Sequence, residues 1–374
     1  MEELHNSYTP IRILMTTDTV GGVWSYSIEL CKALLPCNVH FYLITTGTRM
    51  QPAQQREMAA LANVTVYETD FLLEWMENPW QNVDASGKWL LQLEEKLQPD
   101  LIHINGYVYG SLPWKAPAII VAHSDVFSWF LSVKKMVPPA QWNEYFTRVR
   151  AGLEGADLLI APSKTMLQFI REIYGAITPG KVIYNGRNDD IFYPKQKQQY
   201  VFSMGRIWDE AKNIQLLIKA SSHIYYPIKL AGDNRFENNS SSIESDNIIY
   251  LGKLSMQEVA VQLSTAAVYV LPATYEPFGL SILEAALSGC ALVLGKIESL
   301  QEIWGDSAVY VNTNDVDELA HKVNELMENE WLRNHYAQEA MNRAKQYATT
   351  AMAENYLQVY RQLLQQEQLV SNTV

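Results

Sequence analysis

Short apolar runs alternate with amphipathic stretches along the first half of the chain. A Gly-Gly turn separates the first run, IRILMTTD (11 to 18), from VWSYSIELCKALL, in which apolar residues recur at helical spacing. Five further runs are typical of strands: VHFYLITT (39 to 46), VTVY (64 to 67), LIHING (101 to 106), AIIVAHS (118 to 124) and DLLIAPS (157 to 163). Because helical stretches separate several of these runs, the pattern predicts a parallel, doubly wound sheet.

A second series of strand-like runs repeats this pattern in the other half of the chain. Its members are YVFSMGR (200 to 206), IKLAGD (228 to 233), IIYLG (248 to 252), VYVLPA (268 to 273), ALVLG (291 to 295) and AVYV (308 to 311). Between the two series, in NGRNDDIFYPKQKQQ (185 to 199), the apolar periodicity lapses and turn-forming and charged residues concentrate. The sequence therefore predicts two similar α/β domains in tandem, with a linker that leaves a cleft between them.

Two other stretches complete this outline. The polar stretch NNSSSIESDN (238 to 247) is interpreted as a surface loop. The stretch TTAMAENYLQVYRQLLQQE (349 to 367) predicts a helix whose apolar stripe requires a partner surface. The stripe consists of Met352, Tyr356, Val359, Tyr360 and Leu363.

Length, charge and cysteine content narrow the class of protein. At 374 residues and 48% hydrophobic, the chain is too long for one ordinary core and apolar enough for two. The formal net charge of -12 disfavours a surface that tracks phosphates, so we expect no nucleic-acid partner. Cys31, Cys37 and Cys290 lack metal-site spacing, and buried reduced thiols are favoured over a disulfide, which fits the cytoplasm. We expect a soluble or at most peripheral protein, because no apolar run reaches the roughly 20 residues that span a bilayer.

The stretch YEPFGLSILEAALSGC (275 to 290) carries two glutamates eight residues apart. The PFG turn keeps Glu276 in a loop, whereas SILEAALSG is a run of helix formers that carries Glu284. Because this helix follows the strand VYVLPA, its free amide groups face the carboxyl edge of a parallel sheet, where a diphosphate is stabilised. The two carboxylates would then accept hydrogen bonds from hydroxyl groups on both sides of that anion, as a nucleotide sugar offers. The alternative is a solvated helix with an incidental loop carboxylate.

This pattern of two glutamates around PFGL resembles the retaining glycosyltransferases of family 4, over nearly the whole chain. The resemblance implies the GT-B fold, in which two Rossmann-like domains face each other across a cleft and a C-terminal helix crosses back. Residues 1–190, with 350–374 packed on them, are then the acceptor-side domain, and residues 191–349 bind the nucleotide sugar. The implied reaction moves a sugar from a UDP- or GDP-sugar to a glycan, lipid or small-molecule acceptor with retention of configuration.

The stretch GRIWDEAKN supplies two cations, Arg206 and Lys212, at positions where the family has a basic pair. Two fixed cations neutralise a diphosphate leaving group whose charge grows as the glycosidic bond breaks, so they stabilise the transition state. In the family this pair replaces a metal ion, and Asp189-Asp190 falls in the linker rather than at a strand end. We therefore expect neither a metal nor another cofactor. The alternative is an ordinary basic pair at a helix start.

The resemblance also assigns the other donor contacts. They comprise Glu276 with the backbone amides of Phe278, Gly279 and Leu280 for the sugar, Glu284 for the ribose, and the backbone around Lys253 and Leu254 for the base. The acceptor is expected to attack on the face from which the diphosphate departs, with the leaving phosphate as base. Arg187 departs from the small apolar residue usual in the family, so contacts near the cleft are expected to differ.

Several residues of the first half are candidates for the opposite wall of the cleft. Gly21 and Gly22 let backbone amides approach a phosphate or a sugar, the alternative being a plain tight turn. Asp18 and Trp24 flank this turn and are candidates for acceptor contact. His123 ends the strand AIIVAHSD, and the resemblance gives its neutral imidazole a hydrogen bond to the sugar or the reacting centre.

Two neighbouring segments complete this wall. His103 within LIHING is interpreted as structural, whereas Asn105 and Gly106 directly after it are candidates for lining the acceptor cleft. In VFSWFLSVKKMV (126 to 137), aromatic residues adjoin two lysines. A loop and helix that line the cleft are favoured there over peripheral contact with the inner face of the membrane. A lipid-linked acceptor is compatible with both interpretations.

Two other classes of function keep the same fold. A non-catalytic nucleotide-sugar-binding protein would be expected to have lost motif residues. None of the five main ones is missing: His123, Arg206, Lys212, Glu276 and Glu284. Another GT-B chemistry, such as epimerisation of a nucleotide sugar or phosphorolysis, is disfavoured by the PFGL insert. The sequence leaves the base, the sugar, the acceptor and the oligomeric state open.

Overall fold

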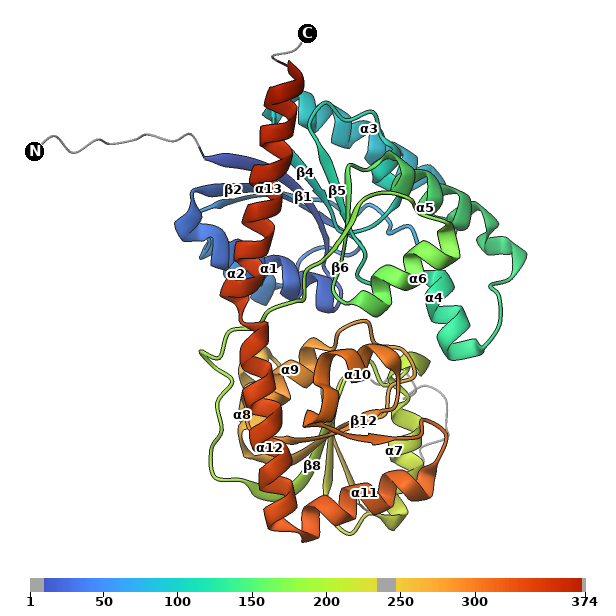
Figure 1. Cartoon of the computed structure of the whole chain (residues 1–374), viewed down its shortest axis with the longest axis vertical. Helices are drawn as coiled ribbons and strands as arrows, with labels where there is room; N and C mark the ends of the chain where they lie inside the picture. The colour runs from blue at the N-terminus through green and yellow to red at the C-terminus, as the bar shows by residue number, and fades with distance from the viewer. Residues whose placement is uncertain (1–9, 234–246, 372–374) are drawn as a thin grey trace, which may run out of the picture.

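Residues 10–233 and 247–371 are described by the computed structural model, in which two α/β lobes lie one above the other (Figure 1). Each lobe is a parallel sheet with helices on both faces, as the alternation of strands and helices predicts. Apart from Asn247, the polar stretch 238–247 that was interpreted as a surface loop lies outside the described residues.

The first lobe holds a seven-stranded sheet, counted over the described residues, in the order β3-β2-β1-β4-β5-β6-β7. Its strands are β1 (Ile11–Asp18), β2 (Val39–Thr46), β3 (Val64–Glu68), β4 (Leu101–Ile104), β5 (Ala118–Val121), β6 (Leu158–Ala161) and β7 (Gly180–Val182). One face packs against α1 (Gly22–Leu34), α2 (Pro52–Ala59) and the C-terminal helix α13 (Thr349–Ser371). The other face packs against α3 (Trp80–Leu97), α4 (Val126–Trp129), α5 (Asn143–Gly155) and α6 (Lys164–Tyr174).

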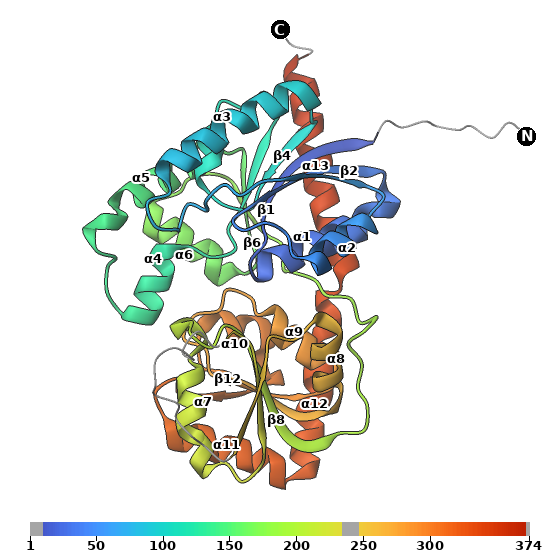
Figure 2. The ribbon, with the colours of Figure 1, turned by 180° about the vertical axis from the view of Figure 1, so that it is seen from behind.

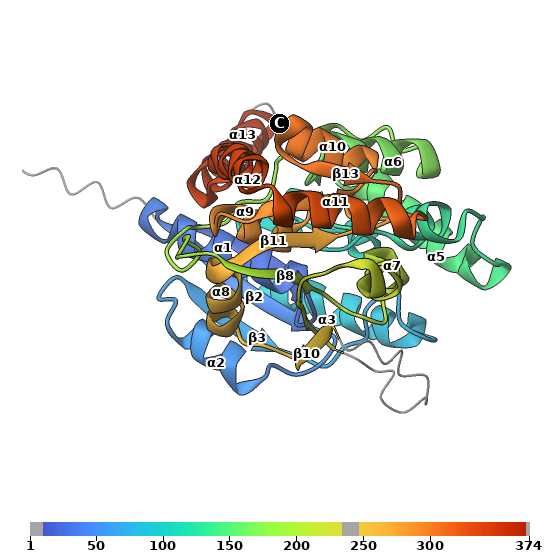
Figure 3. The ribbon, with the colours of Figure 1, turned by 90° about the horizontal axis from the view of Figure 1, so that it is seen from below.

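The second lobe holds a six-stranded sheet, again within the described ranges, in the order β10-β9-β8-β11-β12-β13 (Figure 3). Its strands are β8 (Gln198–Met204), β9 (Ile228–Ala231), β10 (Ile248–Gly252), β11 (Ala266–Leu271), β12 (Ala291–Gly295) and β13 (Val309–Val311). One core contains residues of α8 (Met256–Thr265), α9 (Leu280–Leu287), α10 (Glu298–Trp304) and α12 (Glu330–Ala344). The core on the other face contains residues of α7 (Ile214–Ala220) and α11 (Val316–Glu328).

The predicted strands all occur, because strands covered on both faces appear in the sequence as continuous apolar runs. β7 is an addition to the predicted series, since a three-residue strand shows no periodicity of its own. Cys31 and Cys290 are buried free thiols, as expected. Cys37 is only half-buried, so the expectation of a third buried thiol was wrong; it ends a short surface turn after α1.

The chain passes between the lobes twice, once from β7 to β8 and once from α12 to α13, on the same side of the molecule (Figures 1 and 2). The two connections touch each other at Gly186, where a Cβ atom would lie 2.7 Å from the carbonyl oxygen of Ala348. Any larger residue at this position would push the connections apart. The two covalent connections between the lobes therefore lie side by side, next to Arg187.

Helix α13 crosses back to the first lobe, as predicted (Figure 1). Met352, Tyr356, Val359 and Tyr360 are buried in the same core as α1, and Leu363 packs against that core half-buried. The apolar stripe of the sequence has thus found its partner surface. In the described part of the chain, no helix combines the length and apolar composition needed to cross a bilayer.

Candidate functional site

The loops that follow the carboxyl ends of the strands in both sheets contact each other between the lobes. Gly22, at the start of α1, faces Leu280 at the start of α9, and a Cβ atom at Gly22 would lie 4.0 Å from Leu280 Cδ1. Tyr275, from the loop after β11, donates or accepts a 2.7 Å hydrogen bond with Ser128 of α4. Open α/β sheets bind ligands at this edge, so the candidate site lies where the two edges meet.

Glu276 and Lys212 form the central ion pair of the second lobe's edge. Glu276 lies in the loop between β11 and α9, as predicted, and accepts a hydrogen bond from Lys212 Nζ. Lys212 ends a short turn after β8, and both side chains are largely but not fully covered, with 20% and 11% exposure. The structure therefore brings together two predicted residues that lie far apart in the sequence.

Arg206 lies directly after β8 and is held by Asp209. The guanidinium donates to Asp209 Oδ2 over 2.8 Å, while Oδ1 of the same carboxylate accepts from the backbone of Ala211. Its side chain is 43% exposed. Asp18 of the first lobe interacts electrostatically with Arg206. Burial raises the pKa of Asp18 to about 6, and the positive charge of Arg206 opposes this rise.

The start of α9 offers free backbone amides beside Glu276. Gly279, in the left-handed region at φ 89, turns the chain into the helix, and Phe278 anchors the turn by packing on Tyr347. In the described part of the chain, the N–H groups of Phe278, Gly279 and Leu280 donate to no other protein group. Together with Arg206 and Lys212, they give this edge the positive potential that an anion requires.

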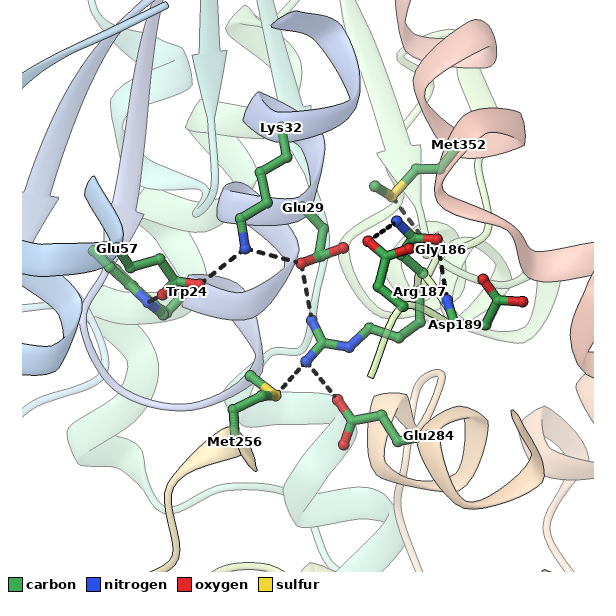
Figure 4. A network of polar contacts seen from close by, with 12 residues as sticks. Trp24, Glu29, Lys32, Glu57, Gly186, Arg187, Asp189, Met256, Glu284 and Met352 are labelled. Atoms are coloured by element: carbon green, nitrogen blue, oxygen red, sulfur yellow. Dashed lines mark hydrogen bonds and ion pairs between the residues drawn. The ribbon is translucent and has the colours of Figure 1, made fainter. Parts of the chain in front are cut away.

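Glu284 lies in α9, as predicted, where its side chain is buried and pairs with Arg187 (Figure 4). Arg187 Nη2 lies 3.0 Å from Glu284 Oε1, and Nη1 lies 3.3 Å from Oε1 of Glu29 in α1. Burial raises the pKa of Glu284 to about 7, an effect that Arg187 opposes and Glu29 reinforces. Arg187, the residue at which the linker departs from the family pattern, thus connects the linker with α1 and α9.

His123 and Asn105 form the opposite, uncharged wall. Asn105 donates through its amide nitrogen to the carbonyl oxygen of Thr16 over 2.8 Å, so its amide oxygen is left to accept from His123 Nε2 at 2.9 Å. This fixes the tautomer of His123 with the proton on Nε2 and a lone pair on Nδ1. Burial lowers the pKa of His123 to about 3, so the imidazole is neutral.

Three predicted residues lie away from this cluster. Trp24 is buried in the first lobe's core, and its indole N–H donates to Glu57 of α2 over 3.2 Å (Figure 4). Lys253 follows β10 at the rim and is exposed, pairing with Asp233 at 3.1 Å, while Leu254 packs half-buried on the core. Gly21, by contrast, lies next to Gly22 at the cleft: it caps α1 with φ 88, and beyond its chain neighbours no heavy atom of the described residues lies within 4 Å of where its Cβ atom would be.

His103 is confirmed as structural. It is completely buried and joins two tyrosines, with Nδ1 2.8 Å from the hydroxyl of Tyr360 in α13 and Nε2 3.3 Å from that of Tyr26. Its neighbour Gly106 packs against the buried carboxylate of Glu74, at 3.4 Å from the position of a Cβ atom. Burial raises the pKa of Glu74 to about 7.

Among the described residues, sequence reasoning missed several contacts that join the lobes, including those of Glu302 and Tyr275. Glu302 of α10 caps the start of α6, where it accepts from the backbone N–H groups of Lys164 and Thr165 at 2.7 and 2.9 Å. Tyr275 reaches the buried Asp125 cluster through Ser128. No spacing within the sequence could reveal either contact, because each joins distant segments of the chain that lie in different lobes.

A pocket of about 280 Å³ lies between the lobes beside Glu276. It is lined by Ser132, Lys135, Thr165, Met166, Phe169, Thr274, Tyr275, Glu276, Pro277, Lys296, Ile297, Glu298, Ser299 and Gln301. Ser132 and Lys135 belong to the aromatic and basic stretch 126–137, which therefore contributes to the cleft, as favoured from the sequence. In the same stretch, Leu131, Met136 and Val137 are exposed. Within the described ranges, no three His, Cys, Asp or Glu side chains cluster as metal ligands would.

Each half of the chain matches a known family of glycosyltransferases. The family described as Glycosyltransferase Family 4 matches residues 20–191, and the family described as Glycosyl transferases group 1 matches residues 187–343. The O-antigen chain mannosyltransferase B of Escherichia coli is 28% identical over 179 residues, which are 44% of this chain and 46% of that protein. The chain thus matches about half the length of that relative.

Another relative and two solved structures extend these comparisons. The N,N'-diacetylbacillosaminyl-diphospho-undecaprenol alpha-1,3-N-acetylgalactosaminyltransferase of Campylobacter jejuni is 30% identical over 33% of this chain and 32% of that protein. Sucrose-phosphate synthase from Thermosynechococcus elongatus superposes with a TM-score of 0.80 at 20% identity, covering 94% of this chain and 98% of that one. HepE from Anabaena in complex with UDP-glucose gives a TM-score of 0.72 at 18% identity, covering 94% and 99%. At these identities the superpositions show the fold.

Proposed function

The chain belongs to the family 4 glycosyltransferases with the GT-B fold, and from this premise we propose that it transfers a sugar from a nucleoside diphosphate donor to a glycan acceptor. The proposal includes retention of configuration and independence of metal ions. The observation that carries it is the Lys212–Glu276 pair beside Arg206 and the free amides of α9. In this arrangement, cations that can bind a diphosphate lie next to a carboxylate that can accept hydrogen bonds from sugar hydroxyls, since Lys212 and Glu276 are in direct contact.

The geometry suggests how each group acts on the donor. Lys212 and Arg206 neutralise the diphosphate, whose negative charge increases as the bond from the anomeric carbon to the phosphate oxygen breaks. Glu276 leaves Lys212 to accept hydrogen bonds from the sugar, so the breaking bond lies between a cation and a carboxylate. The acceptor oxygen forms the new bond to the anomeric carbon, and its proton passes to the departing phosphate oxygen. These cations take the place that a metal ion has in other transferases.

His123 is suited to orient the transferred sugar. Since the N–H group at Nε2 of His123 donates to Asn105, the other ring nitrogen, Nδ1, is the atom that accepts a hydrogen bond from a sugar hydroxyl. Because the imidazole is neutral, it adds no positive charge that would compete with Arg206 and Lys212 for the phosphates.

The pocket beside Glu276 is the proposed place of the acceptor. Phe169 and Tyr275 offer aromatic faces, and serine, threonine and glutamine side chains offer hydrogen bonds, a combination suited to a sugar ring. A glycan acceptor also agrees with the names of the O-antigen and undecaprenol-linked relatives. Whether that glycan is carried on a lipid is part of the test.

A panel of UDP-, GDP- and ADP-sugars tests the proposal. Thermal shift selects the donor, and release of the nucleoside diphosphate is then followed with and without a glycan acceptor, lipid-linked or free. We expect a donor to raise Tm by a few degrees and an acceptor to accelerate release, at a rate unchanged by EDTA. Proton NMR of the product should show the donor's anomeric configuration.

Other outcomes would decide between this proposal and its alternatives. Binding of a nucleotide sugar without release or transfer would identify a non-catalytic binding protein. Loss of activity in EDTA that is restored by a divalent ion would contradict metal independence. A product of inverted configuration would contradict retention.

A further inference from the structure

Arg187 is a buried cation at the place where the two connections between the lobes touch. Its side chain is 4% exposed, its backbone N–H donates to the carbonyl oxygen of Tyr347, and its guanidinium lies over the ring of Phe192 at 5.1 Å. From there it points between the lobes, to Glu29 on one side and Glu284 on the other (Figure 4). The arginine thus belongs to the linker but contacts a helix of each lobe, α1 through Glu29 and α9 through Glu284.

This arrangement is costly for stability alone. Two carboxylates share one guanidinium out of water, and the buried Nε of Arg187 has no hydrogen-bond partner in the described part of the chain. Buried charge networks of this kind contribute little net stability compared with apolar residues of similar size. A role in ligand binding explains why a cation is found here.

We propose that Arg187 is a positioning residue for donor binding, which holds Oε1 of Glu284 so that the other carboxylate oxygen accepts hydrogen bonds from the ribose. The inference deepens the proposed function and rests on it, together with the ribose contact that the family resemblance implies for Glu284. In the described structure, Arg187 is the cation paired with Glu284, and its contact with Glu284 Oε1 leaves Oε2 available. Glu29 holds the other end of the guanidinium from the first lobe, so the orientation of Glu284 depends on contacts that Arg187 makes with both lobes.

The groups facing Glu284 determine how its binding responds to pH. The linker contributes Arg187, α1 contributes Glu29, and β11 contributes the buried hydroxyl of Tyr269; α8 contributes the uncharged Met256. Helix α12 contributes only alanines to the shared core, within the described residues. Arg187 is therefore the group that lowers the pKa of Glu284, which burial raises to about 7. Without Arg187, the carboxyl group would be protonated at neutral pH and would accept hydrogen bonds less well.

Calorimetric binding of UDP, GDP and ADP across pH 6.5 to 9 tests this role without requiring the acceptor. We expect Arg187→Met to weaken binding of the preferred nucleotide about 10-fold or more near pH 7. The difference in affinity between wild type and variant should become smaller towards pH 9, because Glu284 of the variant loses its proton there. Arg187→Lys should retain most of the affinity near pH 7. Glu284→Gln should bind weakly at every pH, because an amide does not titrate in this range.

Two further variants keep the test independent of folding. Arg187→Met/Glu29→Gln removes the cation together with one buried anion, and it should bind more weakly than Glu29→Gln alone, again most strongly near neutral pH. Arg333→Met is the matched control, because Arg333 is also buried but donates to the carbonyl oxygens of Leu326 and Met327, away from the site. This control should lose stability and retain nucleotide binding.

The outcomes separate the two proposals. Wild-type protein that binds none of the three nucleotides would overturn the proposed function, and the role of Arg187 with it. Suppose instead that the wild type binds a nucleotide and that Arg187→Met/Glu29→Gln binds it as tightly as Glu29→Gln does at every pH. This result would overturn only the role of Arg187. A loss that is the same at every pH would also overturn it, since a purely structural role predicts that result.

Discussion

The two edges that meet in the cleft are built from different chemistry. The edge of the second sheet carries charges that are paired with each other: Lys212 with Glu276, Arg206 with Asp209, and Glu284 with Arg187 of the linker. The edge of the first sheet carries the carboxyl group of Asp18, and with it His123 and Asn105, which are neutral and hydrogen-bonded to each other. The edge of the second sheet holds exchangeable ion pairs, whereas His123 and Asn105 at the edge of the first sheet are fixed uncharged groups.

This difference matches the two halves of a transfer reaction. A group in an ion pair can exchange its partner for a phosphate or a hydroxyl, so the charged edge is preorganised for a diphosphate donor. A neutral side chain whose hydrogen bonds are already made keeps its position when charge develops nearby. The comparison therefore predicts large effects from changes to the charged edge, smaller effects from changes to the neutral edge, and no effect on rate from the interior behind it.

Removing the central cation is the strongest way to break the comparison. Lys212→Ala should reduce kcat/KM about 100- to 1,000-fold, because the leaving diphosphate loses a fixed positive charge where its own charge increases. The measurement is release of the nucleoside diphosphate from the preferred donor. Lys322→Ala on α11 is the control, since Lys322 is paired with a carboxylate at the surface far from the site. A rate within about threefold of wild type for Lys212→Ala would remove this residue from the mechanism.

The sequence predicted the fold well because the fold depends on local patterns. Buried strands appear as apolar runs, and the stripe of α13 has helical spacing, so both were recognisable before their partners were known. The exception is β7, whose three residues carry no period. Trp24 shows a limit of the same kind. It lies close to the glycine turn in sequence, but as the third residue of α1 it is turned into the core, a direction set by helical phase.

The site was predictable only where a motif carries the chemistry. Glu276 and Lys212 were recognised through the PFGL and GRIWDEAKN stretches, and the structure places them in contact. Arg187 was visible as a departure from the family, but its two carboxylate partners lie on helices of different lobes. The Glu302 cap of α6 left no signal in the sequence, because backbone N–H groups at a helix start are present in any sequence.

The neutral edge is tested by His123→Ala. We expect kcat/KM to fall about 10- to 100-fold, the range for one lost hydrogen bond to a reacting substrate, with a smaller loss for Asn105→Ala, which frees the imidazole tautomer. Because burial lowers the pKa of His123 to about 3, the pH profiles of wild type and His123→Ala should have the same shape between pH 5.5 and 8.5. The measurement is the initial rate at each pH. A break near pH 6.5 in the wild type that His123→Ala abolishes would show that His123 titrates during catalysis.

The smallest expected effect separates the neutral edge from the interior directly behind it. His103 lies in β4 close to His123 in space, but its Nδ1 is bound to Tyr360 of α13 at 2.8 Å and has no exposure to the cleft. Tyr360→Phe leaves this buried nitrogen without a partner and should cost about 1 to 2 kcal/mol, which lowers Tm by roughly 2 to 8 °C. Calorimetry measures this, and Tyr225→Phe is the control, because Tyr225 is 75% exposed. The rate of sugar transfer should not change; a fall in rate at unchanged Tm would instead make His103 part of the working edge, and the two edges would then not differ as described.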